Sequence, residues 1–266
     1  MDRETTNKYL KTHGILPESR FGQNFLCDED IIASIVEIAG IRKGDRVLEI
    51  GPGIGALTRP LSAMDIDLTS VEIDKRLSEI LREDPDINAQ VIDSDFLKLT
   101  DYNPEAFDIV ISNLPYYVMT DIMKKLFAEC INARKMVFMV EEEATARIDA
   151  SPKTKQYGPL AVLTAVYGVY SEELTVQGSC FIPAPRTTSA VISLTRSEDA
   201  KALNKEFVRF VDTCFSMRRK KLTNSLKAYP KEIVEGAYSK LGLDPNVRAE
   251  ELAPEVFISL YDAIIN

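Results

Sequence analysis

The chain has 266 residues, enough for one large domain or for a core with an appendage, and its 45% hydrophobic and 27% charged residues are typical of globular proteins. Its apolar stretches are far shorter than the roughly 18 residues of a membrane span, and its first residues lack the apolar segment of a signal peptide. The four cysteines show no CxxC spacing, and the single histidine, His13, lies in a polar stretch. The composition therefore argues against disulfide scaffolds and histidine-dependent triads, and we expect a soluble, cytoplasmic, metal-free protein without a membrane partner.

The net charge of −9 is unusual for a protein that binds phosphate backbones. The charge is unevenly distributed, because residues 1–200 carry a net −11 and residues 201–266 a net +2. The second segment contains a run of cations without an intervening acid, namely Arg218, Arg219, Lys220, Lys221 and Lys227. Taken alone, such a run more often indicates a solvated helix face than a binding site.

Short apolar segments alternate with helical segments through the first two thirds of the chain. Five segments have the pattern of buried strands, at residues 46–51, 67–73, 89–95, 107–113 and 135–141. Helices are expected at residues 28–41, with Asp28 as the N-cap, and at residues 55–64 and 74–84. Two later strands, 171–178 and 188–196, lack an obvious helix between them and are expected to pair at a sheet edge. This order predicts an α/β fold with a parallel sheet covered on both faces.

From about residue 200 the pattern becomes purely helical. Apolar residues at helical spacing predict helices at 204–217, 220–229, 231–242 and 254–264. We therefore expect an α/β domain at residues 1–200, beginning with an N-terminal arm at residues 1–26, and a small all-α domain at residues 201–266.

A glycine-rich loop follows the first strand, with Gly51, Gly53 and Gly55 at alternate positions. Glycines let the backbone turn tightly and approach a ligand, and the next helix points amide groups at the same crevice. Glu72 ends the second strand, 21 residues after Gly51, where a carboxylate can accept both hydroxyls of a ribose. These features predict a site for a nucleoside-containing cofactor, although the spacing differs from GxGxxG and a structural turn remains an alternative.

Asp95 and Phe96 follow the third strand. The carboxylate could accept from an adenine amino group while the ring packs against the base. A helix N-cap followed by a core aromatic residue explains the pair equally well.

The segment NLPYY at the end of the fourth strand is the most specific motif. Asn113 offers a side-chain carbonyl at the edge of the sheet where ligands bind, and Pro115 stiffens the turn. The Leu114 carbonyl and the Tyr116 ring complete a set of two acceptors beside an aromatic plate. A planar exocyclic amine requires such a set, although a strand-ending turn with buried tyrosines is the simpler possibility.

These motifs together resemble the rRNA adenine N6-dimethyltransferase family, and within it the small-subunit branch of the kasugamycin-sensitivity and dimethyladenosine transferase type. The resemblance is carried by residues 21–26 (FGQNFL), 49–58 (EIGPGIGALT), 72–74 (EID), 95–96 (DF), 113–117 (NLPYY) and 181–185 (FIPAP). The tail is similar to that branch at residues 215–222 (FSMRRKKL) and 248–252 (RAEEL).

The resemblance implies a Rossmann-like fold that uses S-adenosylmethionine, without a metal, to dimethylate N6 of two adjacent adenosines in small-subunit rRNA or its precursor particle during ribosome biogenesis. A monomer is expected. The implied donor-binding residues are Gln23, Asn24, Leu26, Gly51, Gly53, Glu72, Ile73, Asp95, Phe96 and Asn113. The implied catalytic residues, which hold the target adenine, are Asn113, Leu114, Tyr116 and Phe181. Within the helical domain, the candidate RNA-binding residues are Arg218, Arg219, Lys220 and Lys221.

Two segments depart from the family pattern. Residues 141–143 are three glutamates where a Gln-Lys-Glu type sequence is usual, and residues 186–188 read Arg-Thr-Thr in place of Lys-Val-Asp. Both departures concern the RNA-binding surface and leave the donor motifs unchanged.

Three alternatives stay open: a large-subunit methyltransferase of the macrolide-resistance type, a paralogue that acts mainly as an RNA-binding assembly factor, and a nicotinamide-dependent oxidoreductase that would use the glycine loop. The last would leave the NLPYY and FIPAP motifs without a role.

Overall fold

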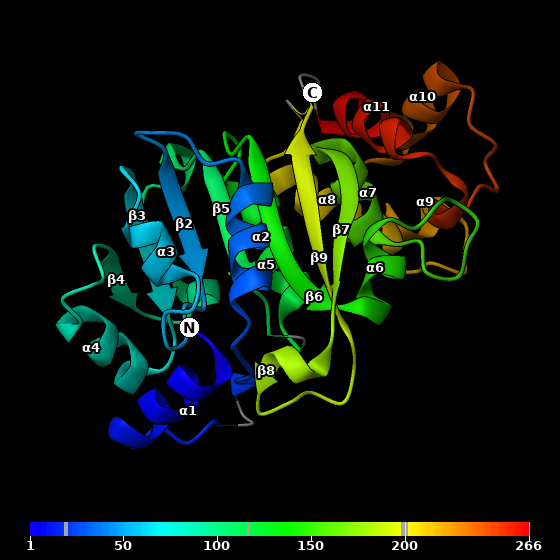
Figure 1. The fold of residues 1–266 in the computed structure, drawn as a ribbon. Helices are drawn as coiled ribbons and strands as arrows, with labels where there is room; N and C mark the ends of the chain where they lie inside the picture. Colours follow the sequence, from blue (N-terminus) through cyan, green and yellow to red (C-terminus); the bar gives the residue numbers. More distant parts are fainter. Residues whose placement is uncertain (19–20, 116, 198–199, 201, 266) are drawn as a thin grey trace. The chain divides into compact units, whose positions relative to one another are not determined.

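The computed structural model describes residues 1–18, 21–115, 117–197, 200 and 202–265 (Figure 1). The chain divides into two compact units. The first consists of Met1–Ile122, Asn132–Thr145 and Ser171–Thr195, and the second of Met123–Ile131, Ala146–Tyr170 and Arg196–Asn266. The assignment of donor binding to residues 1–200 and of RNA binding to residues 201–266 stays a prediction.

A seven-stranded sheet forms the centre of the first unit (Figure 1). Its strands, in spatial order, are β4 (Gln90–Asp93), β3 (Asp67–Glu72), β2 (Arg46–Ile50), β5 (Ile109–Asn113), β6 (Lys135–Glu141), β9 (Ser189–Arg196) and β7 (Gly168–Val176). The strands from β4 to β6 pair in parallel, and β9 pairs antiparallel with β6. The α/β fold class is therefore confirmed, and β7 and β9 are neighbours at the sheet edge as expected.

Three helices of the first unit follow the predicted pattern but are shorter: α2 (Glu29–Ala39), α3 (Thr58–Ser62) and α4 (Lys75–Glu83). Asp28 caps α2, because its carboxylate accepts from the Ile31 amide at 3.1 Å. Helix α2 lies over one face of the sheet (Figure 1), and its Ile35 is buried with Val47 and Ile109 of the strands. Short 3₁₀ turns lie at Phe96–Lys98 and Pro104–Ala106. Helices α5 (Met119–Glu129) and α6 (Glu142–Ile148) each contribute residues to both units.

The N-terminal arm contains a helix that the sequence analysis missed, α1 (Arg3–Thr12). Leu10 is buried in one cluster with Phe25, Ile54 and Leu77, so the helix packs behind the glycine loop. The guanidinium of Arg3 donates to the backbone carbonyl of Phe181 at 2.9 Å and to that of Ser179. This contact is beside a two-stranded sheet in which β1 (Phe25–Leu26) pairs antiparallel with β8 (Phe181–Ile182), after a 3₁₀ turn at Gly178–Cys180.

The second unit is helical. It contains α7 (Pro159–Tyr167), α8 (Lys205–Phe215), α9 (Leu222–Ser225), α10 (Lys231–Leu241), a 3₁₀ turn at Ala249–Glu251 and α11 (Pro254–Ile265). Its core is aromatic, with the Phe215 and Phe257 rings stacked at 5.5 Å. The predicted helix at residues 220–229 is wrong in extent, because Lys220 and Lys221 precede α9 and lie in the turn after α8. No helix in the described part of the chain is long and apolar enough to cross a membrane.

Candidate functional site

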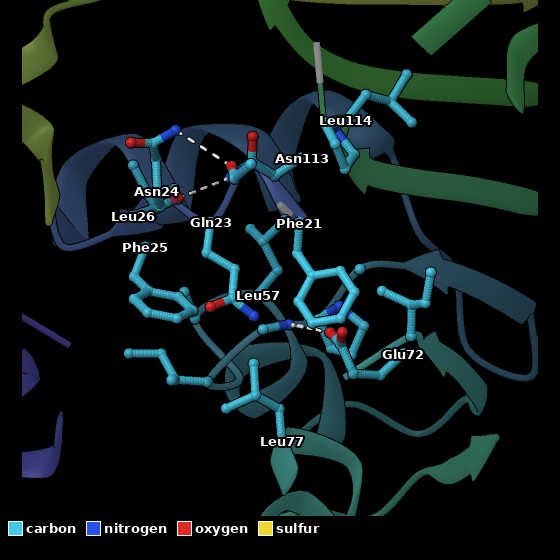
Figure 2. Close-up of a pocket in the computed structure, with 18 of the residues that line it drawn as sticks. Phe21, Gln23, Asn24, Phe25, Leu26, Leu57, Glu72, Leu77, Asn113 and Leu114 are labelled. Carbon is cyan, nitrogen blue, oxygen red and sulfur yellow. Dashed lines mark hydrogen bonds between the residues drawn. The ribbon is translucent and has the colours of Figure 1, made fainter. Parts of the chain in front are cut away.

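A hollow at the carboxyl ends of β2, β3 and β5 brings most of the predicted site residues together (Figure 2). Ligands of open α/β sheets bind at this edge. The predicted residues that line it are Gln23, Asn24, Leu26, Gly51, Gly53, Glu72, Ile73, Asn113, Leu114 and Phe181. The lining also includes residues that the prediction did not name, among them Phe21, Phe25, Glu49, Leu57 and Leu77. The enclosed space is about 90 Å³.

The glycine loop has the backbone conformation that its sequence suggested. Gly51 and Gly53 have φ angles of +70° and +60°, in the left-handed region that favours glycine. A Cβ atom on Gly53 would lie 3.3 Å from the ring of Phe25, so a side chain there would crowd the hollow. The Gly53 amide donates to the Glu72 carboxylate at 2.9 Å (Figure 2).

Glu72 lies at the end of β3 with 4% of its surface exposed. Its Oε2 accepts from the Gly53 amide, and its Oε1 accepts from the Asp74 amide at 2.8 Å. Burial raises the pKa of this carboxyl to about 7. Because each carboxylate oxygen has two lone pairs, each can accept one more hydrogen bond from a ligand hydroxyl.

A second buried carboxyl, Glu49, lines the same hollow from β2 and is 1% exposed. Its Oε2 accepts from the hydroxyls of Thr58 at 2.9 Å and Ser70 at 2.8 Å. Burial raises its pKa to about 7, and the neighbouring Glu72 contributes to the increase. Sequence reasoning missed Glu49 as a site residue, although a glutamate inside the apolar segment RVLEIG was a usable signal.

Asn113 ends β5, and its side chain points toward Asn24 in the segment at residues 21–26 that lines the hollow (Figure 2). Its Nδ2 donates to the Asn24 carbonyl at 3.4 Å, and the Asn24 side chain donates in turn to the Gly22 carbonyl at 3.2 Å. A backbone carbonyl can accept only, so the amide nitrogen of Asn113 must face it. The carbonyl oxygen Oδ1 therefore faces away from Asn24 and is the acceptor that a ligand can use.

The segment over the hollow is attached to the β3–α4 connection through Gln23. The side chain of Gln23 accepts from the Glu18 amide at 2.8 Å and donates to Asp74 at 3.0 Å. Arg76 binds the same Asp74 carboxylate through two nitrogens, at 3.1 and 2.7 Å, and lies 2.5 Å from Glu18. The Arg76 guanidinium and the Gln23 amide hold the pKa of Asp74 below its usual range despite burial. Gln23 thus anchors the covering segment, and its proposed contact with the donor stays a prediction.

The other predicted residues either lie outside the lining of the hollow or contribute only to its wall. Asp95 caps the 3₁₀ turn by accepting from the Leu97 amide at 3.0 Å, and Phe96 is buried beside the ring of Tyr102; neither lines the hollow. Their donor-binding role stays a prediction. Phe181 is 1% exposed and forms part of the wall. Tyr116 lies outside the described residues.

The four candidate RNA-binding cations of the helical unit, at residues 218–221, differ in their contacts and exposure. Arg218 donates to the Glu250 carboxylate at 2.7 Å and to the carbonyls of Lys155 at 2.7 Å and Thr154 at 2.9 Å, so its guanidinium stabilises the fold. Arg219, Lys220 and Lys221 are exposed. Among the described residues, no group of three or more His, Cys, Asp or Glu side chains is placed to hold a metal ion.

Comparisons with known proteins agree with this geometry. Residues 17–266 match the family model "Ribosomal RNA adenine dimethylase". "Ribosomal RNA small subunit methyltransferase A" from Clostridium botulinum (strain Loch Maree / Type A3) is 39% identical over 98% of both chains, and its namesake from Shouchella clausii is 35% identical over 97% of this chain and 93% of the relative.

Solved structures show the same fold. A dimethyladenosine transferase from Plasmodium falciparum superposes with a TM-score of 0.71 at 23% identity, covering 89% of this chain and 95% of that one. The 23S rRNA methyltransferase ErmE superposes with a TM-score of 0.60 at 28% identity, covering 91% and 100%. The chain belongs to the ribosomal RNA adenine dimethylase family, which confirms the methyltransferase class predicted from its motifs.

Proposed function

We propose that this protein transfers methyl groups from S-adenosylmethionine to N6 of two adjacent adenosines in small-subunit rRNA. The observation that carries the proposal is that Glu72, Asn113 and Leu114 line one hollow, next to the glycine loop in which Gly51 and Gly53 have positive φ angles. Curated relatives named for the small ribosomal subunit are 35–39% identical over nearly the whole chain, which favours the small-subunit substrate.

The residues of the hollow suit a nucleoside-containing donor. Gly51 and Gly53 keep the loop free of side chains, and Glu72 offers a lone pair on each oxygen to the two ribose hydroxyls. When bound, S-adenosylmethionine would supply an electrophilic methyl group on a sulfonium, whose sulfur leaves as a neutral thioether. Ile73, which also lines the hollow, provides apolar surface next to the carboxylate.

The target amine would be held by two acceptors. The lone pair of an adenine N6 amine is delocalised into the ring, which makes the nitrogen a poor nucleophile. Asn113 Oδ1 and the Leu114 carbonyl can each accept one hydrogen bond from the N6 amine, and this geometry favours a tetrahedral nitrogen with a localised lone pair. Leu114 is fixed for this role because its amide donates to the Met139 carbonyl at 3.0 Å.

A strong general base is not required in this scheme. The nitrogen becomes acidic as it gains a methyl group and positive charge, so its proton can pass to water. Phe181 lies in the wall where it can pack against a base that has left its stack, and Arg3 holds the Phe181 backbone. The chain then contributes mainly by positioning the two reactants.

Admission of the reactants requires movement of the covering segment. The hollow encloses about 90 Å³, whereas pockets for small molecules measure roughly 300–1,000 Å³. Phe21, Gln23 and Asn24 line it, and the contacts of Gln23 and Arg76 with Asp74 hold this segment in place. We infer that these contacts loosen when the donor and the target base enter.

The direct test is to incubate the protein with S-adenosylmethionine and unmethylated small-subunit particles, and to map N6,N6-dimethyladenosine in the RNA. Large-subunit RNA is tested in parallel, because ErmE, a 23S rRNA methyltransferase, has the same fold and the large-subunit substrate is therefore the alternative to exclude. Two adjacent dimethyladenosines in the small-subunit RNA are expected. Methylation confined to large-subunit RNA, or donor binding without methylation of either RNA, would refute the proposal.

A further inference from the structure

A second hollow lies in the helical unit, lined by residues of α9, of α10 and of the segments that flank α10. It is open to solvent and has a volume of about 690 Å³, within the roughly 300–1,000 Å³ of pockets that hold small molecules. Its apolar floor is formed by the buried side chains of Leu226, Val234 and Tyr238. It shares no lining residue with the hollow that contains Glu72.

The rim of this hollow is basic. Lys221, Lys227 and Lys231 line it, together with one acid, Glu235, which lies 3.5 Å from Lys231. Within the described part of the chain, no acidic side chain pairs with Lys221 or Lys227. Residues 213–231 contain six basic residues and no acidic one, although the whole chain has a net charge of −9. The charge of the rim is therefore complementary to an anionic ligand.

Aromatic and polar side chains line the same space. The ring of Tyr229 is half-buried and is held edge-on by Phe210 at 6.1 Å. Tyr238 is 6% exposed, and its hydroxyl has no hydrogen-bond partner among the residues that the structure describes. Asn224 and Ser239 add hydrogen-bonding groups to the lining. Single-stranded RNA is bound by such a combination, in which bases stack on aromatic rings and cations neutralise phosphates.

We propose that this hollow binds an unstacked nucleotide of the substrate RNA, with the base on the half-buried ring of Tyr229, above the floor that contains Tyr238, and the phosphate beside Lys227. The inference rests on the proposed function, because it takes the ligand from the RNA that the enzyme methylates. It adds a binding site whose residues are distinct from those of the methyl-transfer site. Recognition of the RNA would then depend on a base that is not itself methylated.

The test compares charge variants that differ only in position. Lys227→Glu changes a lysine that lines the hollow, and Lys240→Glu makes the same change at an exposed residue of α10 that does not line it. Binding to unmethylated small-subunit particles and to naked small-subunit rRNA is measured over a range of salt. We expect Lys227→Glu to weaken both more than Lys240→Glu, and to make the salt dependence shallower by about one unit.

A second variant fills the hollow without changing charge. Ser239→Phe starts from an exposed position in the lining and is expected to weaken binding to both probes roughly fivefold or more, as the loss of one stacked base does. Thermal unfolding and S-adenosylmethionine affinity should match the parent chain in all three variants.

The outcomes separate the two proposals. If the parent chain methylates the particles but the variants at positions 227 and 239 bind like Lys240→Glu, the nucleotide site is refuted and the proposed function stands. If binding weakens on particles but not on naked rRNA, the occupant is a protein segment and the inference is also refuted. A parent chain that neither binds nor methylates small-subunit RNA refutes the proposed function, and this inference with it.

Discussion

Replacing Glu72 with glutamine is expected to remove the pH dependence of S-adenosylmethionine binding together with part of the affinity. The carboxyl of Glu72 is buried, and its pKa is raised to about 7 because burial disfavours the charge. Ribose hydroxyls donate to the ionised form, so the donor complex retains fewer protons than the free protein. Affinity must then rise as the pH rises through the pKa of the free protein.

The magnitude follows from that pKa. For a single group that titrates near pH 7, affinity increases about tenfold between about pH 6 and about pH 8, which corresponds to about 1.4 kcal/mol. At the upper end, Glu72→Gln is expected to lose about 1–3 kcal/mol of binding free energy, the range for removing a charged acceptor from buried donors. Its affinity should vary little over the same pH range, because an amide does not ionise.

Isothermal titration calorimetry at several pH values measures both effects. The matched control is Glu79→Gln, since Glu79 is exposed on α4 and contacts Lys75 at 3.8 Å. A pH profile that persists in Glu72→Gln would refute the reasoning and would assign the titration to Glu49, whose pKa is also raised to about 7. Glu49→Gln tests that reassignment, and thermal unfolding of each variant verifies that it is folded.

Three further predictions concern the amine site, the N-terminal helix and the basic cluster. Asn113→Ala should keep donor affinity better than turnover, and turnover within about twofold, roughly 0.4 kcal/mol of barrier, would exclude the amine-positioning role. Arg3→Ala should lower turnover on RNA more than donor affinity, because Arg3 holds the backbone of Phe181. Lys8→Ala, on the exposed face of α1, should leave both quantities unchanged, and equal effects of the two variants on turnover would contradict this role of Arg3. Neutralising Arg219 and Lys220 together should make the slope of log affinity for RNA against log salt shallower by about one to two units, and an unchanged slope would place the RNA surface elsewhere.

The sheet was predictable because its strands carry a local signal. Segments such as 107–113 and 135–141 are mostly apolar and short, which is typical of strands buried on both faces of a parallel sheet. The missed helices lacked the corresponding signal. Helix α7 is apolar on nearly all sides, so it shows no amphipathic period, and α1 has two buried residues, Thr6 and Leu10. Their places are set by tertiary packing.

The site residues were predictable where a local motif requires one residue type, such as glycine at a positive φ angle. Gly51 and Gly53 need positive φ angles and Glu72 ends a strand, so local sequence was sufficient to place all three at the hollow. The engagement of Arg218 by Glu250 and by the carbonyls at residues 154–155 was not predictable, because these partners are distant in sequence. A run of four cations therefore gave no indication of which one the fold uses.

The two buried carboxyls connect stability with donor binding. Burial raises the pKa of each carboxyl from 4.5 to about 7. Each group therefore takes up a proton more readily in the folded state, so the free energy of unfolding is highest below about pH 4.5. It falls by roughly 3 kcal/mol per group as the pH rises through about 7. This net value already includes the hydrogen bonds that Glu49 accepts from the Thr58 and Ser70 hydroxyls and that Glu72 accepts from two backbone amides, without which the cost of burial would be larger. A cost of this size at the glycine-loop hollow is typical of groups held for binding. The donor hydroxyls proposed for Glu72 would offset that cost further, so the carboxyl that destabilises the empty protein is also the one that favours the bound state.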